Sequence, residues 1–414
     1  MPIDSARLWS RLEALAAITE PDRPWTRRSF TPMFLKGRAW LEAEFRRAGL
    51  ETRIDAGGNL IGRLEGREQG LPPVLIGSHS DTVPSGGRYD GPLGIFAALE
   101  VAQAVIARGE KLRHPLEVVD FLAEEPSEFG LSCIGSRALA GALTPADLAR
   151  TRPDGMTLAG GIAYAGGNPA ALAEARRPPG TIAAYCEVHI EQGRSLENEG
   201  LPIGIVTDIA GIRRERLTVT GRTDHAGATP MPLRADALVG AAAIIEAAYA
   251  RALAQSGGDK PLVATIGAVS VEPNAANAVP GRVVLVLEVR SGDEAKIDAF
   301  APALLAEVAP RLATLGVTVS AERISHVAPT PCAEVVRAAI AQGAAKAGLK
   351  TRPLFSGAGH DAVFVSAAGP VGMIFTPCRE GRSHAPEEAM EPHQAADGAR
   401  ALYEAVLVLD ATLD

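Results

Sequence analysis

The chain has 414 residues, of which 47% are hydrophobic and 4% aromatic, and its formal net charge is −8. This length exceeds the usual size of a single hydrophobic core, so we expect two domains. The negative charge argues against nonspecific binding of nucleic acid, which requires a basic face. A small anionic substrate remains open, because a local arginine can outweigh the global field.

The N-terminus and the cysteines favour a soluble, cytoplasmic protein with no membrane partner. Residues 1–20 carry charges throughout and lack the apolar core of a signal peptide. No apolar run reaches membrane-spanning length, since even residues 239–254 contain Glu246 and Arg251. The four cysteines form no CxxC pair, so we expect buried free thiols rather than a disulfide framework or a thiolate zinc site.

In chain order, the first part of the sequence alternates between helices and apolar strands. Helical periodicity covers 5–18 and 33–48, a hairpin-like segment covers 52–66, and a short apolar strand lies within 72–81. A buried helix at 94–109 precedes apolar strands within 115–125 and 181–193, with helical segments between those two strands. A helix at 333–347 and a strand at 369–377 resume the pattern. This alternation indicates an α/β domain with a mostly parallel central sheet.

The pattern changes at about residue 211. Residues 213–227 alternate like a half-exposed strand, and a helix at 236–253 follows. Strands at 261–273 and 281–292, a helix at 293–313 and a strand at 316–325 complete a β-α-β-β-α-β order. This order is the split, ferredoxin-like unit. We therefore predict an inserted α+β domain at 211–325 and a discontinuous catalytic domain at 1–210 and 326–414.

Histidines and carboxylates gather at the ends of four apolar strands of the first domain. They are His79, Asp81 and Asp90 in the first case, Glu124 and Glu125 in the second, His189 in the third and His384 in the fourth. Open parallel sheets bind ligands beyond the carboxyl ends of their strands. Any one of these residues alone fits a solvated turn equally well.

The set as a whole favours a pair of divalent metal ions. Imidazole and carboxylate bind zinc, manganese, cobalt or nickel, and a carboxylate can bridge two ions. The five candidate ligands are His79, Asp90, Glu125, His189 and His384.

Asp81 and Glu124 have supporting roles in this interpretation. Asp81 is expected to accept the other imidazole N–H of His79 and fix its tautomer. Adjacent carboxylates on an extended segment point to opposite sides, so Glu124 is expected to face a bound water and act as general base while Glu125 binds metal. The alternative for the Glu pair is a charged helix start.

Longer stretches around these residues resemble one family, the N-carbamoyl-L-amino-acid amidohydrolases. The stretches are GSHSDTVPSGGRYDG, AEEPSEFG, IGSRALAG, EVHIEQGRSLE, TDHAGATPMPLRADAL, the segments of Asn277 and Arg290, SGAGHDA and RSHAPEE, and they span nearly the whole chain. The family includes allantoate amidohydrolases and bacterial β-ureidopropionases, within the dinuclear zinc aminoacylase and carboxypeptidase superfamily. The resemblance implies an α/β catalytic domain, a small lid and dimerisation domain, and hydrolysis of a ureido C–N bond.

The resemblance also implies how the metals are shared. His79 and His189 would bind the first ion, and Glu125 and His384 the second, with Asp90 bridging the two. It likewise implies Glu124 as general base and Asp81 as the residue that orients His79.

Five residues are implied as substrate contacts. His225 would reach the active site of the partner subunit in a homodimer and stabilise the developing oxyanion, while Asn277 and Arg290 would hold the substrate carboxylate. Gln192 and Gly359 would make further contacts. A planar guanidinium matches a carboxylate bidentately, but Arg290 as a solvated strand end, Asn277 as a turn former and His225 as a cap remain alternatives.

The hypothesis is metal-dependent hydrolysis of N-carbamoyl-L-amino acids to the amino acid, carbon dioxide and ammonia. Allantoate hydrolysis and β-ureidopropionase activity are alternatives, and dipeptidase or N-acylamino-acid deacylase activity and a non-catalytic binding protein on the same scaffold are more distant ones. The family pattern has Gly after the Glu pair and Arg two positions later, where this chain has Pro126 and Glu128. The pocket wall therefore departs from the family, and the substrate stays open.

Overall fold

The computed structural model describes residues 2–413 of the chain. These residues form two units: unit 1 comprises residues 2–207, 332–354 and 360–413, and unit 2 comprises residues 208–331 and 355–359. The sequence carries no signal that residues 355–359 belong with unit 2, because they lie beyond the helix that follows the inserted segment.

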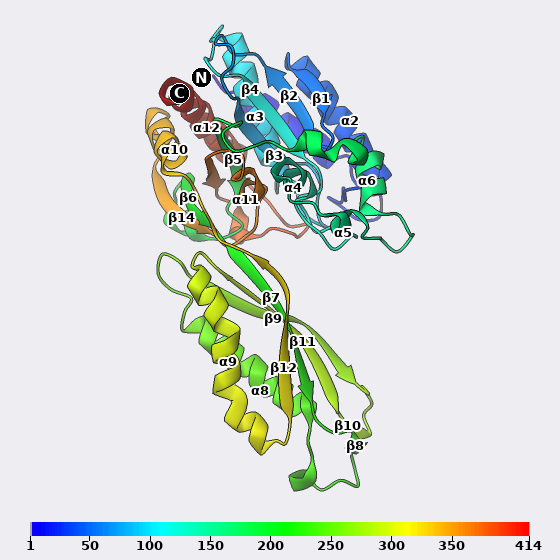
Figure 1. Cartoon of the computed structure of the whole chain (residues 1–414). Coiled ribbons are helices and arrows are strands. Elements are labelled where there is room, and N and C mark those ends of the chain that lie inside the picture. The colour runs from blue at the N-terminus through cyan, green and yellow to red at the C-terminus, as the bar shows by residue number, and fades with distance from the viewer. Residues whose placement is uncertain (1, 414) are drawn as a thin grey trace. The chain divides into compact units, whose positions relative to one another are not determined.

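Unit 1 is built on a mixed sheet with strand order β1-β2-β4-β3-β5-β15-β6, and β14 also pairs with β6 (Figure 1). The neighbours β4–β3, β3–β5 and β5–β15 are parallel. These four strands are buried along their whole length, as expected for a parallel sheet that is covered by helices on both faces. The strands are β1 (Glu51–Ile54), β2 (Leu60–Leu64), β3 (Val74–His79), β4 (Leu116–Phe121), β5 (Ala184–Ile190), β6 (Ile203–Ile209), β14 (Thr351–Ser356) and β15 (Val371–Thr376). The predicted α/β fold with a mostly parallel central sheet is confirmed.

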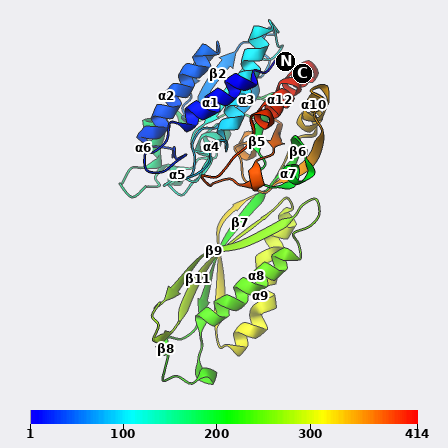
Figure 2. The same cartoon turned by 180° about the vertical axis from the view of Figure 1, so that it is seen from behind.

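Helices cover both faces of this sheet. One face carries α1, α2, α3, α10 and α12, which share the main hydrophobic core with β3 and β5 (Figure 2). On the other face α4 contacts β4, and α11 contacts β5 and β15, while α6 joins a smaller core. The helices of unit 1 are α1 (Ser5–Ala16), α2 (Pro32–Arg47), α3 (Pro92–Ala107), α4 (Ile134–Ala140), α5 (Pro145–Leu148), α6 (Leu158–Tyr164), α7 (Ser195–Glu199), α10 (Glu334–Lys346), α11 (Ala362–Val365) and α12 (Pro392–Thr412), with 3₁₀ turns η1 (Pro169–Ala175) and η3 (Arg379–Gly381).

Unit 2 has a four-stranded antiparallel sheet of order β12-β7-β11-β9, with α8 and α9 packed on one face. Its chain order is the predicted β-α-β-β-α-β. Alternation along β7 buries Leu217 and Val219 against the helices and leaves their neighbours outward, as a one-sided sheet requires. The elements of unit 2 are β7 (Gly211–Thr220), β8 (Asp224–His225), η2 (Met231–Leu233), α8 (Ala237–Leu253), β9 (Leu262–Glu272), β10 (Ala278–Val279), β11 (Arg282–Ser291), α9 (Glu294–Thr314), β12 (Thr318–Val327) and β13 (Thr330–Pro331).

Most predicted elements are present, but strands β6, β13 and β14 of the first sheet and the 21-residue helix α12 were not predicted. The hairpin predicted at 52–66 is the β1–β2 pair, and the helices predicted at 94–109 and 333–347 are α3 and α10. Strands β6 and β14 were not predicted, because a Gly in IGIVTDI and a Pro in TRPLFS weaken their strand signal.

All four cysteines are free and buried, as predicted. Among residues 2–413, no helix combines the length and the apolar character that crossing a bilayer requires.

A buried carboxylate and a buried arginine together link three helices of unit 1. Glu100 of α3 is fully buried and accepts hydrogen bonds from Arg7 (2.6 and 2.7 Å) and Arg11 (2.7 Å), both on α1. Arg11 also donates to Glu44 of α2 at 3.0 Å. Because both partners of the Arg11–Glu100 pair are buried, neither can exchange its partner for water.

We predict that Glu100→Ala lowers the free energy of unfolding by about 3 kcal/mol, because it leaves the buried Arg11 guanidinium short of one counter-charge. Urea titration followed by circular dichroism would measure this. Glu322→Ala is the matched control, since Glu322 pairs with Arg216 while its side chain is 69% exposed, and its cost should stay below about 1 kcal/mol. Equal losses for the two variants would contradict the prediction.

Candidate active site

Two groups of possible metal ligands lie at the carboxyl ends of β3, β4, β5 and β15 in unit 1. One group is His79, Asp90 and His189, and the other is Asp90, Glu125 and His384; within each group the ligand atoms lie within 4.8 Å of one another. The structure therefore brings together all five residues that the sequence singled out, and Asp90 belongs to both groups.

The two oxygens of Asp90 face different groups. Oδ1 lies 3.5 Å from Nε2 of His79 and 3.2 Å from Nε2 of His189. Oδ2 lies 3.3 Å from Nε2 of His384, which in turn is 3.2 Å from Oε1 of Glu125. One carboxylate thus serves two sets of imidazole ligands, as a bridge between two ions requires.

The tautomers of His79 and His189 fit a cation between them. Nδ1 of His79 lies 3.1 Å from the carbonyl of Asp81, and Nδ1 of His189 lies 2.9 Å from the carbonyl of Ile190. A carbonyl only accepts, so Nδ1 carries a proton in each ring, and Nε2 is the nitrogen that can offer a lone pair to a cation when the ring is neutral. His189 Nε2 is buried with no hydrogen-bond partner. Lone pairs that converge on a carboxylate oxygen are stabilised by a divalent metal ion, so this donor set fits one.

Charge within the site follows from the same contacts. Burial alone would raise the pKa of Asp90, but His189, His384 and His79 hold it well below its usual range. Hydrogen bonds to Asp90 and Glu125 raise the pKa of His384 to about 11. Asp90 is therefore an ionised carboxylate despite its burial.

Asp81 contacts both His79 and the glutamate pair. Its carboxylate lies 3.5 Å from Nδ1 of His79, farther than its own backbone carbonyl at 3.1 Å. The carboxylate also accepts the backbone N–H groups of Glu124 (3.2 Å) and Glu125 (3.3 Å). Both the carbonyl and the carboxylate of Asp81 thus lie near Nδ1 of His79, and the carboxylate also ties the glutamate pair to the His79 loop.

Glu124 lies beside the ligands but belongs to neither group among the described residues. Its Oε2 is 3.7 Å from Nε2 of His79, and its Oε1 is 3.7 Å from Sγ of Cys133. Burial raises the pKa of Glu124 well above its usual range, and repulsion from Glu125 and Asp361 adds to this, against the attraction of His79. Glu124 is therefore a buried carboxyl next to the ligands that has a high affinity for a proton.

The loop between β3 and α3 is shaped by one glycine and one buried arginine. Gly91 has φ +82°, and a Cβ at this position would lie 2.5 Å from the His79 ring, so any side chain would displace that ligand. Arg27 is buried and donates to the carbonyl of Ser80 at 2.9 Å, while the Ser80 hydroxyl donates to the buried Asp120 at 3.0 Å. These contacts fix the backbone between His79 and Asp90.

Gln192 also reaches this site. Its Nε2 donates to Oδ2 of Asp90 at 2.6 Å, and its Oε1 is buried without a hydrogen-bond partner. The amide therefore holds one free acceptor beside the two ligand groups.

His225 and Asn277 lie together in unit 2. Residue 278 pairs with His225 between β10 and β8, and the backbone N–H of Ala226 donates to the carbonyl of Asn277 at 3.0 Å. Nδ1 of His225 accepts the N–H groups of Gly227 (3.0 Å) and Ala228 (3.1 Å). The proton of this imidazole is therefore on Nε2, which is available as a donor.

Arg290 and Gly359 lie at the other end of the unit 2 sheet. Arg290 is near the end of β11 and donates to the carbonyl of Gly357 at 2.9 Å. Asn277 precedes β11, whose first residue is Arg282. Eight residues of extended strand span about 26 Å, so the structure does not bring Asn277 and Arg290 of one chain together.

Several buried polar groups around the site escaped the sequence analysis. Glu187 lies two residues before His189 on the same face of β5, a spacing that could have identified it. Glu187, His189 and His360 form a third group of possible ligands. The oxygens of Glu187 already accept the hydroxyls of Ser78 (2.6 Å) and Tyr185 (2.9 Å), so Glu187 supports the β3–β5 contact.

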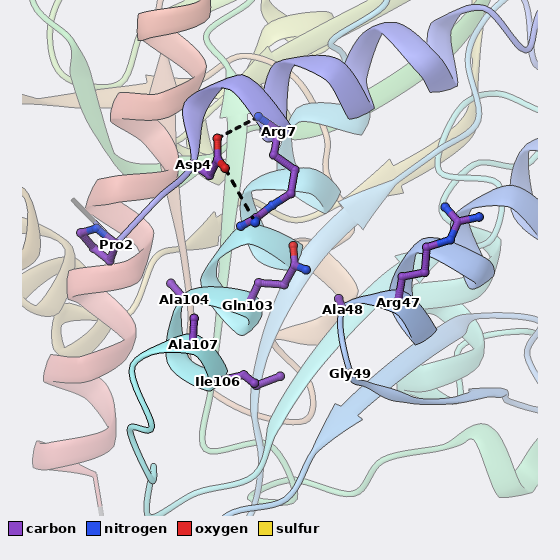
Figure 3. Close-up of a pocket in the computed structure, with 10 residues that line it drawn as sticks. All are labelled: Pro2, Asp4, Arg7, Arg47, Ala48, Gly49, Gln103, Ala104, Ile106 and Ala107. Carbon is purple, nitrogen blue, oxygen red and sulfur yellow. Dashed lines mark hydrogen bonds and ion pairs between the residues drawn. The ribbon is translucent and has the colours of Figure 1, made fainter.

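A hollow elsewhere in unit 1 has no such chemistry. It measures about 610 Å³ and lies among α1, α2 and α3, where Asp4, Arg7, Arg47 and Gln103 line it (Figure 3). Arg7 is paired with Glu100 and Asp4, and Arg47 with Glu44. These arginines are neutralised and are not positioned for an anionic ligand.

The chain belongs to peptidase family M20/M25/M40, whose model matches residues 75–408. Together with the two ligand groups, this makes the protein a metal-dependent hydrolase that acts on amides.

Three curated relatives are named as an N-carbamoyl-L-amino acid amidohydrolase, a ureidoglycolate hydrolase and an allantoate amidohydrolase. The chain is 40% identical over 405 residues to the N-carbamoyl-L-amino acid amidohydrolase of Geobacillus stearothermophilus, covering 98% of each chain. It is 33% identical to the ureidoglycolate hydrolase of Arabidopsis thaliana, covering 97% of this chain and 86% of that one, and 33% identical to the allantoate amidohydrolase of Bacillus subtilis, covering 91% and 90%.

A solved structure also matches over the whole chain. A hydantoinase/carbamoylase family amidase from Burkholderia multivorans has a TM-score of 0.88 and 34% identity, covering 100% of this chain and 99% of that one. The protein is an amidohydrolase of this group.

We predict that Asp90→Asn lowers the bound divalent metal from about two ions per chain to below one, because both ligand groups lose their common anion. Atomic emission on protein reconstituted with Zn²⁺ would measure this. Asp397→Asn removes a similarly buried carboxylate, which pairs with Arg400 in α12 and should leave the metal content unchanged. Two ions in the Asp90 variant would contradict the bridging geometry.

Proposed function

We propose that the protein hydrolyses the ureido C–N bond of N-carbamoyl-L-amino acids with two divalent metal ions. The products are the free amino acid, carbon dioxide and ammonia. The observation that carries this proposal is the division of Asp90 between two imidazole groups, with the Glu124 carboxyl left outside both. The name of the relative that shares 40% of its sequence with this chain supports the substrate class.

In this proposal the ligand residues hold two ions of a type that this imidazole and carboxylate set accepts. His79, His189 and Asp90 form the first site, and Asp90, Glu125 and His384 form the second. Zinc, manganese, cobalt and nickel all suit such ligands. When bound, the ions supply a water of lowered pKa and polarise the ureido carbonyl.

Glu124 is the proposed general base. It accepts the proton of the attacking water and returns it to the nitrogen that leaves with the amino acid. Its buried position beside His79 favours both steps, because the carboxyl lies next to the ligand groups and away from bulk water. The free Oε1 acceptor of Gln192 suits an N–H of the ureido group.

The residues of unit 2 are the proposed contacts to the rest of the substrate. The Nε2–H of His225 would donate to the oxygen on which negative charge develops, an interaction that contributes strongly in such reactions. The Arg290 guanidinium would hold the α-carboxylate bidentately, with Gly359 beside it. Asn277, which lies next to His225 in unit 2, would also contact the substrate.

This assignment requires two copies of the chain. A substrate of amino-acid size cannot span the roughly 26 Å of strand that separates Arg290 from the end of the sheet carrying Asn277 and His225. We propose that Arg290 and Gly359 act on the substrate of their own chain, while His225 and Asn277 act on that of the partner in a homodimer.

The outer surface of unit 2 supports a dimer. Strand β9 is an edge strand of 11 residues with Val263 and Val269 exposed, and the adjoining helix α8 exposes Tyr249 (69%) and Leu253 (62%). An open strand edge beside an exposed apolar helix face is suited to isologous pairing with a second copy.

We predict that Glu124→Gln abolishes hydrolysis, lowering kcat at least about 100-fold, while both metal ions stay bound, since the loss is confined to proton transfer. Turnover of N-carbamoyl-L-methionine by metal-loaded protein would measure this, with atomic emission as the control for metal content. Wild-type turnover by the variant would refute the role of Glu124.

The same assay identifies the substrate. We expect N-carbamoyl-L-methionine to be turned over faster than allantoate, ureidoglycolate, N-carbamoyl-β-alanine or N-acetyl-L-methionine. Preference for one of the other ureido compounds would transfer the proposal to that substrate, and no turnover of any of them by two-metal protein would favour a binding protein instead.

We also predict complementation between two inactive variants. In a mixed dimer of Glu124→Gln and His225→Ala chains, one of the two sites holds both native residues. Random mixing by reversible dissociation should restore about one quarter of wild-type activity. Activity that stays at the level of the separate variants, with mixed dimers verified by mass spectrometry, would contradict the contribution of His225 in trans.

A further inference from the structure

Glu388 joins the two loops that carry Asp90 and His384. It lies between β15 and α12 and is 1% exposed. Its Oε1 accepts the backbone N–H groups of Tyr89 (2.7 Å) and Asp90 (3.2 Å), and its Oε2 accepts the hydroxyl of Ser383 (2.9 Å). A single carboxylate therefore bonds to Asp90 itself and to the residue that precedes His384.

Ser383 carries this connection into the ligand group. Its Oγ lies 2.9 Å from Oε2 of Glu388 and 2.5 Å from Oδ2 of Asp90. The same Asp90 oxygen faces Nε2 of His384 at 3.3 Å. The position of Ser383 therefore decides where the next residue presents its imidazole.

His384 depends on such a connection more than the other histidines do. His79 and His189 lie in β3 and β5, and each side chain is 1% exposed, so strand pairing and packing hold both rings. The His384 side chain is 48% exposed, and its backbone has φ 55° in an irregular segment. A non-glycine residue in this conformation is maintained by its surroundings, and here those are the bonds of the adjacent loop.

The space around the Glu388 carboxylate is closely fitted. A Cβ on Gly87 would lie 1.9 Å from its Cδ and 2.0 Å from both of its oxygens. On the far side of the loop, the indole N–H of Trp25 donates to the carbonyl of Pro386 at 3.2 Å. The carboxylate occupies a buried position that only a glycine leaves open.

We propose that Glu388 is a positioning residue that fixes His384 against Asp90, so that the second metal group depends on it more strongly than the first, which shares only Asp90 with this network. This inference rests on the proposed two-metal function. Residues behind metal ligands change metal affinity by about 10- to 100-fold in other sites, and Glu388 is expected to act at this level on the second ion.

Three variants test this proposal. In Glu388→Ala the donors of Tyr89, Asp90 and Ser383 lose their acceptor, so the second ion should bind at least about tenfold more weakly, while the first, held also by His79 and His189 in their strands, should be weakened less. Glu388→Gln keeps Oε1 as acceptor and offers an N–H to Ser383 Oγ, so it should retain both ions. Asp410→Ala is the matched control, because Asp410 accepts the backbone N–H groups of Arg113 (3.0 Å) and His114 (2.9 Å) away from the ligands.

The readouts separate positioning from loss of stability. Chelator competition and atomic emission give the affinity and number of ions, and thermal unfolding gives the stability. Excess metal should restore kcat in Glu388→Ala, which a loss of folded protein would not allow. Asp410→Ala should lower stability while keeping both ions at wild-type affinity.

Gly87→Ala provides a second route if Glu388→Ala does not fold. Its methyl group would displace the carboxylate without removing it, and the same preferential weakening of the second ion is expected. Two ions at wild-type affinity in Glu388→Ala, or in Gly87→Ala where only that variant folds, would overturn the role of Glu388 and leave the proposed function intact. Fewer than two ions in the wild-type protein would contradict both.

Discussion

The site depends on one buried carboxylate whose two oxygens face different histidines. Asp90 is 5% exposed. Its Oδ1 faces His79 and His189, and its Oδ2 faces His384. Buried carboxylates and imidazoles are costly unless charge and hydrogen bonds compensate them. The lone pairs that converge here are best compensated by cations, and this requirement explains why so many charged groups occupy the interior at one edge of the sheet.

The topology of unit 1 places these groups together. Because β4, β3, β5 and β15 are parallel neighbours, residues at their carboxyl ends meet at the same edge although they are up to about 300 positions apart in the chain. Gly91 then allows α3 to begin directly against the His79 ring. Arg27 and Asp120 hold Ser80, in the loop that follows β3, by hydrogen bonds to its carbonyl and its hydroxyl. Contacts within the protein therefore position the loop beside His79.

The sequence predicted the parts of the site that follow from topology. The five candidate ligands could be grouped because each lies at or beyond the carboxyl end of an apolar strand, and strand ends converge by a general rule. Residues such as Ser383 and Glu388 could not be assigned this way, because their contacts come from the path of an irregular loop. The carbonyl of Asp81 as the nearer partner of His79 also depends on a local backbone conformation that no motif specifies. The separation of Asn277 from Arg290 becomes visible only once the register of β11 is known.

Two divalent ions on either side of Asp90 are the central claim. Anomalous X-ray diffraction at the zinc absorption edge, on crystals grown with Zn²⁺, measures this most directly. The account predicts two peaks about 3.5–4 Å apart, one beside His79 and His189 and the other beside Glu125 and His384. A single peak, or peaks away from Asp90, would contradict it.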